Sequence, residues 1–169
     1  MSLSMNRDIP GIIVKRLKRE KPSLIEKYHN HEIDIVKYDC PNTLNTKKYS
    51  VGVKIKIDNT LLEIKLSDTY PFHPPKFFIN DVNYRDMLQI GIPYVQKSLN
   101  KMGIDCLCCK SILCANFWNP TKKIIDVINE YETNKKIITR IIKHHYTELV
   151  CHSKNIYDTL IIDKINYLI

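Results

Sequence analysis

Residues 49–66, YSVGVKIKIDNTLLEIKL, decide the fold class of this chain. Apolar side chains alternate with polar or small ones in both halves, and the polar pair Asp58-Asn59 separates the halves. Alternation with period two is typical of a strand with one buried face, and a short polar interruption is typical of a hairpin turn. The stretch therefore predicts two antiparallel strands with one face against a core and one face in water. The apolar positions are Val51, Val53, Ile55, Ile57, Leu62, Ile64 and Leu66.

Two further strands flank this hairpin. HEIDIVKYD at 31–39 shows the same alternation and is followed by a turn-like CPNTLNT at 40–46. After the hairpin, TYPFHPPKFFIN at 69–80 holds three prolines in five residues, which exclude a helix or a central strand at that point. Residues 76–80 then resume as an edge strand. The four segments predict a four-stranded antiparallel meander.

Segments with helical spacing precede and follow the meander in the sequence. IIVKRLKREK at 12–21 is basic and amphipathic, and Pro22 is expected to break this short helix. Residues 81–105 lack a clear period and predict a long irregular connection with a helical turn around 94–101. Helical spacing returns after Pro120, and a last helical stretch spans 154–168. The order predicts an α+β fold with the sheet sandwiched by helices.

The composition is that of one ordinary globular domain. The chain has 169 residues, 44% hydrophobic and 26% charged, which excludes collagen-like and low-complexity classes. Residues 1–4 resemble an added leader before a second Met, so we expect a single domain over 5–169. Lys and Arg exceed Asp and Glu by 26 to 18, but the lysines are spread among apolar residues. No aromatic-interleaved basic stripe and no membrane-length apolar run is present, which disfavours nucleic acid and membrane partners.

Four of the six cysteines crowd into DCLCCKSILCANFWNP at 105–120. Such crowding differs from a dispersed disulfide framework and favours a reducing compartment, cytoplasmic or nuclear, or the cytoplasm of a host cell if the chain is viral. The segment could hold a thiolate nucleophile, inert buried thiols or zinc. If 106–109 is extended, its thiols point to both faces, which argues against zinc on Cys106, Cys108, Cys109 and Cys114. We expect no cofactor, and Cys40 and Cys151 are expected to be ordinary core or surface residues.

The order of these motifs resembles the ubiquitin-conjugating enzymes. That family has a helix, a four-strand meander, Y-P-(F/Y)-x-P-P, a cysteine before a short S-I-L or D-I-L run, and W-(S/T)-P at the next helix. Over residues 12–131 the chain matches with Cys109-Lys110-Ser111-Ile112-Leu113, and residues 132–169 are divergent C-terminal helices. The structural motif residues are Tyr70, Pro71, Pro74, Pro75, Trp118 and Pro120.

The resemblance implies a UBC-like fold and a transferase that carries ubiquitin or a ubiquitin-like protein as a thioester on Cys109. The family's His-Pro-Asn is replaced by Leu99-Asn100-Lys101, so Asn100 is the candidate for oxyanion or loop support, and Ser111 is a weaker catalytic candidate. The segment from Tyr70 to the cysteine is also longer than in the family. These departures leave open an inactive UBC-like module that binds proteins.

The resemblance also implies partner proteins. The basic helix corresponds in position to the family's surface for the activating enzyme, and a ligase is a further expected partner. Solvated surface positions are the alternative role for these side chains. His144 and His145 are expected to be surface residues. The candidate docking residues are Lys15, Arg16, Lys18 and Arg19.

Overall fold

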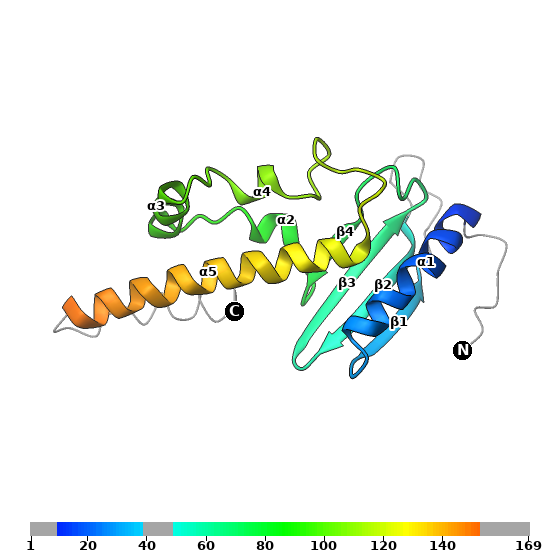
Figure 1. Ribbon diagram of the computed structural model, residues 1–169, viewed down its shortest axis with the longest axis horizontal. Helices are drawn as coiled ribbons and strands as arrows, with labels where there is room; N and C mark the ends of the chain where they lie inside the picture. Colours follow the sequence, from blue (N-terminus) through cyan, green and yellow to red (C-terminus); the bar gives the residue numbers. More distant parts are fainter. Residues whose placement is uncertain (1–9, 39–48, 153–169) are drawn as a thin grey trace.

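The computed structural model describes residues 10–38 and 49–152, which form an α+β fold (Figure 1). The predictions for residues 1–4, for 40–46 with Cys40, for the side chain of Cys151 and for 154–168 lie outside the described part. The elements are α1 (Gly11–Lys27), β1 (Glu32–Lys37), β2 (Tyr49–Ile57), β3 (Thr60–Ser67), β4 (Lys76–Ile79), β5 (Val82–Asn83), α2 (Tyr84–Met87), α3 (Pro93–Lys101), α4 (Leu107–Lys110) and α5 (Ile124–His152).

The sheet has the order β1-β2-β3-β4-β5, and every neighbouring pair is antiparallel. The predicted meander is confirmed in its four main strands. The short β5 is an addition, because the two residues after β4 form a tight hairpin. Asn80 and Asp81 both have positive φ, 46° and 66°, and a two-residue turn of this kind favours Asn and Asp. β4 is therefore not the edge strand.

One face of the sheet carries the core and the other carries charge. The alternating apolar positions of β2 and β3 are buried except Ile57, which is half-buried, and Ile55, Leu62 and Ile64 are fully buried. On the opposite face Glu63 pairs with Lys54 at 3.2 Å and Lys65 at 3.0 Å. The prediction of one wet face is confirmed. The prediction that helices sandwich the sheet is wrong for the described residues. On this face Lys54 and Lys65 are partly exposed, and Glu63 is covered by Tyr38, which follows β1 and donates to it at 2.6 Å.

Pro22 does not break α1, contrary to the prediction. The helix runs through it to Lys27, and the side chains that follow the proline, Leu24 and Tyr28, are 2% and 4% exposed. A proline inside a helix removes one backbone hydrogen bond and crowds the carbonyl four residues earlier. Burial of these two large side chains outweighs that cost.

The region predicted as an irregular connection contains ordered elements. The helical turn expected around 94–101 is confirmed as α3, and α2 precedes it. α3 packs beside α5, where Tyr94 stacks on His145 with ring centroids 3.8 Å apart. His144 is exposed as expected, whereas His145 is half-buried by this stacking. α5 is one continuous helix that extends well beyond the sheet (Figure 1).

No helix in the described part of the chain is long and apolar enough to cross a membrane. α5 has the length, but Lys, Arg, Asp and Glu side chains recur along it. Its buried positions form one stripe, from Ile124 through Ile128 and Tyr131 to Ile138 and Ile142. A single apolar stripe with a charged remainder is the pattern of a helix that packs on a protein core.

A buried carboxylate, Glu20, joins α1 to two distant segments. Its side chain is 1% exposed and accepts hydrogen bonds from the Tyr70 hydroxyl at 2.8 Å and the Ile124 backbone amide at 2.6 Å. Arg16 forms an ion pair with it and also donates to the Lys122 carbonyl at 2.7 Å. Burial and the Glu20 charge raise the pKa of Tyr70, so this hydroxyl keeps its proton and remains a donor. The contacts fix the loop after β3 and the first turn of α5 against α1.

We predict that Glu20→Ala lowers the free energy of unfolding by about 3 kcal/mol, because buried donors and a guanidinium lose their common acceptor. Glu20→Gln keeps an acceptor for Ile124 and should cost less. Urea denaturation followed by Trp118 fluorescence measures both losses. Glu26→Ala changes an exposed glutamate of the same helix and is expected to stay within about 0.5 kcal/mol of the parent. Equal losses for Glu20→Ala and Glu26→Ala would contradict the role of the buried carboxylate.

Candidate functional site

The candidate site is the short turn that carries Cys106, Cys108 and Cys109. Cys106 is the N-cap of α4, and its sulfur accepts a hydrogen bond from the Cys109 backbone amide at 3.4 Å. The Cys106 and Cys108 Sγ atoms lie 2.7 Å apart, and those of Cys108 and Cys109 lie 3.8 Å apart. All three sulfur atoms lie within 4.8 Å of one another. The turn is thus a cluster of converging thiols.

This convergence corrects the premise of an extended 106–109 segment. An extended chain would point Cys109 away from Cys106 and Cys108, but a helical turn brings positions three apart to the same side. The sequence argument against zinc therefore fails for these three residues. Cys114 does not belong to the group of converging sulfur atoms.

The three thiols differ in ionisation and access. A hydrogen bond from the Cys108 thiol, together with one from the Cys109 backbone, lowers the pKa of Cys106 to about 7. The same contact with Cys106, and then burial, raise the pKa of Cys108 to about 12. These opposite shifts make Cys106 the more acidic thiol of the two. Cys109 is the exposed member of the cluster, whereas Cys106 and Cys108 are half-buried.

Both flanks of the turn are held by neighbouring helices. On the N-terminal side, Gln96 of α3 donates to the Asp105 carbonyl at 2.7 Å. On the C-terminal side, Glu130 of α5 accepts from the Ser111 hydroxyl at 2.6 Å and from the Ile112 amide at 2.7 Å. Ser111 is 1% exposed, so its hydroxyl supports the turn from the interior. Sequence reasoning missed Gln96 and Glu130, which lie on helices with no motif around them.

The proline motif and the Trp118-Asn119-Pro120 motif contact each other directly. The indole Nε1 of Trp118 donates to the Pro71 carbonyl at 2.7 Å, and its ring lies 6.1 Å from that of Tyr70. Tyr70 is fully buried, and Pro71 and Pro75 are buried beside it, whereas Pro74 is half-buried and Pro120 is exposed. Two segments 47 residues apart are thereby joined. The Trp118–Pro71 hydrogen bond and the hydrogen bonds of Glu20 together hold the chain between the cysteine turn and α5 in place.

Two candidate residues near the turn have contacts of their own. Asn100, at the end of α3, accepts a hydrogen bond from the Gln96 side chain at 2.8 Å. Within residues 10–38 and 49–152 no hydrogen bond joins Asn100 to Cys109. Lys110 donates to the Gly103 carbonyl at 3.2 Å, so its ammonium group closes the loop before the cysteines. The structure brings the three cysteines together but leaves Asn100 engaged with α3.

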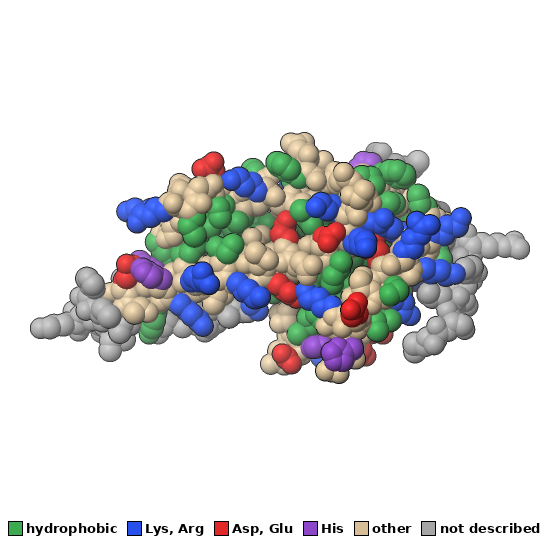
Figure 2. Space-filling model, in the orientation of Figure 1, with side chains coloured by type: hydrophobic (Ala, Val, Ile, Leu, Met, Phe, Trp, Pro, Cys, Tyr) green, Lys and Arg blue, Asp and Glu red, His purple; other side chains and the backbone are tan. Residues whose placement is uncertain are grey.

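The candidate docking residues on α1 separate into two kinds. Arg16 is half-buried and tied to Glu20, so it belongs to the core network. Lys15, Lys18 and Arg19 are exposed. Figure 2 shows Lys and Arg side chains on this face mainly over α1 and along α5, with Asp and Glu among them. The exposed part of α1 is therefore a basic patch of limited extent.

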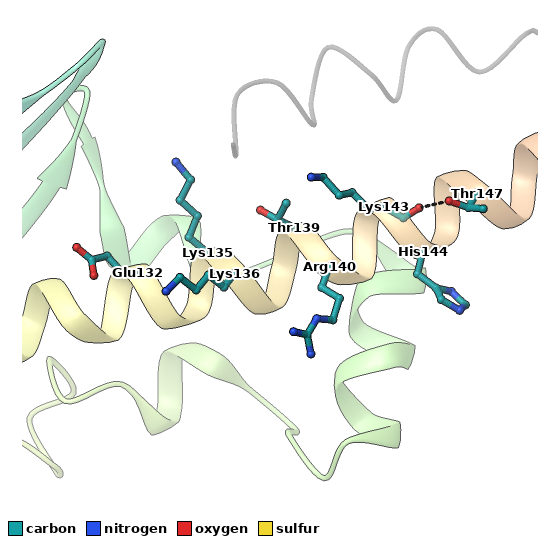
Figure 3. Close-up of a pocket in the computed structure, with 8 residues that line it drawn as sticks. All are labelled: Glu132, Lys135, Lys136, Thr139, Arg140, Lys143, His144 and Thr147. Atoms are coloured by element: carbon teal, nitrogen blue, oxygen red, sulfur yellow. Dashed lines mark hydrogen bonds between the residues drawn. The ribbon is translucent and has the colours of Figure 1, made fainter.

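A hollow of about 770 Å³ also lies beside α5, away from every candidate residue. The eight described side chains that line it come from this one helix, and four of them are Lys or Arg (Figure 3). None of the described thiols Cys106, Cys108, Cys109 and Cys114 is among them. The described part of the lining is mainly cationic. The lining residues are Glu132, Lys135, Lys136, Thr139, Arg140, Lys143, His144 and Thr147.

We predict that Glu130→Ala loosens the cysteine turn, because the Ile112 amide and the Ser111 hydroxyl lose their acceptor. The amide of Ile112 should then exchange with deuterium faster by on the order of tenfold, which corresponds to a net hydrogen bond of about 1.4 kcal/mol. Hydrogen exchange read by mass spectrometry measures this rate. Glu148→Ala, an exposed glutamate of the same helix, is the control. Unchanged exchange at Ile112 in Glu130→Ala would show that α5 does not hold the turn.

Comparison with known proteins returns no match. No family model, no curated protein and no solved structure matches this chain. The structure shows an α+β fold, and the similarity to the ubiquitin-conjugating enzymes stays an expectation from the sequence motifs.

Proposed function

We propose that this protein is a divergent ubiquitin-conjugating enzyme with a UBC-like fold, which carries ubiquitin or a ubiquitin-like protein as a thioester on Cys109. The observation that carries the proposal is the exposed thiol of Cys109, at the position that the motif order gives to the nucleophile. The hydrogen bond from Trp118 to Pro71 supports it, because it joins the two motifs on which the resemblance rests. The α+β fold with an antiparallel meander is compatible with this function.

In the loading step, the Cys109 thiolate attacks the carbonyl carbon of the thioester that links the modifier to the activating enzyme. A new sulfur–carbon bond forms, the old one breaks, and the activating enzyme leaves as a thiolate. The proton of the Cys109 thiol passes to solvent or to a neighbouring base. The sulfur of Cys106 lies within 4.8 Å of the Cys109 sulfur.

In the transfer step, a lysine amine of the substrate attacks the same carbonyl carbon. The tetrahedral oxyanion collapses, the Cys109 thiolate leaves, and the amine loses one proton as the amide forms. A positioned donor to the oxyanion contributes about 3 kcal/mol to such a step. Asn100 is the candidate for that donor, and its NH₂ group is available because its hydrogen bond with Gln96 uses the amide oxygen.

A second candidate is a UBC-like module that binds a modifier or another protein without forming a thioester. The contact between Asn100 and Gln96 favours it, because this contact holds the amide on α3 and not at Cys109. The missing His and Pro before Asn100 support the same alternative. Saturable binding of ubiquitin, in the absence of any covalent adduct, would support this second candidate.

The experiment is a loading assay with activating enzyme, ATP and ubiquitin. We predict an adduct that gains the mass of one ubiquitin per chain and disappears on addition of reductant. Cys109→Ala should abolish the adduct, because the nucleophile is lost. Intact-mass spectrometry of the quenched reaction measures the adduct.

Cys114→Ala is the matched control for folding and should load normally, since Cys114 lies outside the thiol cluster. Cys106→Ala should still load, at a reduced rate. Loading lost in Cys106→Ala but kept in Cys109→Ala would assign the nucleophile to Cys106 and contradict the proposal. Absence of an adduct with ubiquitin and with several ubiquitin-like proteins would contradict the transferase function.

A further inference from the structure

The cysteine turn holds more thiols than a site with a single nucleophile needs. A thioester-forming site requires one cysteine, whereas this turn brings three sulfur atoms within 4.8 Å of one another. Thiolate sulfur is the preferred ligand of thiophilic d¹⁰ cations. We infer that Cys106, Cys108 and Cys109 form a three-thiolate site for such a cation, with Zn²⁺ as its first candidate.

One of the distances between the sulfur atoms already equals the distance that zinc requires, and all three atoms lie within 4.8 Å of one another. A tetrahedral zinc with bonds of about 2.3 Å to sulfur places its ligands about 3.8 Å apart. Cys108 and Cys109 already lie at 3.8 Å. Cys106 and Cys108 are closer, at 2.7 Å, so their sulfur atoms must move apart by about 1 Å to bind the same zinc ion.

The turn is held in place before a metal arrives. Gln96 fixes the Asp105 carbonyl on one side, and Glu130 fixes Ser111 and Ile112 on the other. Leu107, between the cysteines, is 7% exposed and anchors the turn in the core. A site whose ligands are fixed by their surroundings loses less conformational entropy on binding.

The described residues supply three ligands and leave a fourth position open. Neither Cys114 nor any His, Asp or Glu of the described part joins the group. Closed structural zinc sites have four protein ligands, whereas sites with three leave room for water or an incoming ligand. Cys109 is exposed, so solvent reaches the thiol cluster. Binding releases the thiol protons to solvent, so affinity should rise with pH.

Metal binding would also occupy the sulfur of Cys109. This consequence rests on the proposed function, because a Cys109 bound to zinc cannot attack a thioester. The cation would then inhibit loading, and removal of the cation would restore it. The binding itself is independent of any transferase activity.

The test of binding is a cobalt titration of the reduced full-length protein. Co²⁺ should bind at one equivalent per chain and give thiolate-to-cobalt charge-transfer absorption, and Zn²⁺ should displace it. Cys106→Ser, Cys108→Ser and Cys109→Ser should each weaken binding by on the order of tenfold or more. Cys114→Ser is the matched control and should bind as the parent does. No charge-transfer absorption, or equal binding by the triple variant, would overturn the site.

A second readout follows the thiols themselves. Zn²⁺ should slow the alkylation of Cys109 by iodoacetamide by on the order of tenfold or more, while Cys114 should react at an unchanged rate. Equal alkylation of Cys109 with and without Zn²⁺ would contradict the site. Cobalt binding without ubiquitin loading leaves the metal site standing and rejects the transferase. Ubiquitin loading without cobalt binding supports the transferase and rejects the metal site. Failure of the metal site and failure of the transferase are therefore distinguishable.

Discussion

The buried carboxylate of Glu20 is the interaction on which the arrangement of this protein depends. One side chain accepts from Tyr70 in the loop between β3 and β4, from the first turn of α5 at Ile124, and from Arg16 of its own helix. A charge with almost no exposure is costly unless each of its lone pairs has a donor, so the three segments must meet at this point. These contacts thus fix the positions of the sheet, α1 and α5 relative to one another.

The position of the candidate site depends on these contacts of Glu20. Trp118 ties the approach to α5 to Pro71, one residue after the Tyr70 that donates to Glu20. Further along α5, Glu130 holds the C-terminal side of the cysteine turn, and α3 holds the other side through Gln96. The exposed Cys109 therefore lies on a short turn whose two flanks are hydrogen-bonded to neighbouring helices.

Residue patterns predicted the parts of the fold in which local preference and burial agree. The period-two alternation around Asp58 predicted the central hairpin, and the helical spacing after Pro120 predicted α5. The pattern failed at Pro22, where burial of the following turn outweighs the local cost of proline. It also failed at Cys106 to Cys109, because three close cysteines have no period that distinguishes an extended strand from a helical turn. Glu130 could not be found at all, since its partners are set by the packing of α5 against the turn.

The most direct test of the central claim uses a ubiquitin whose C-terminal glycine carries a thiol-reactive electrophile. This probe forms a stable bond with the sulfur that approaches the modifier's C-terminus, and peptide mapping then identifies that sulfur. A single cross-link on Cys109, prevented by prior alkylation of the protein, is the predicted result. Cross-links spread equally over Cys106, Cys109 and Cys114, or none on a protein shown to be folded, would contradict the role proposed for this turn.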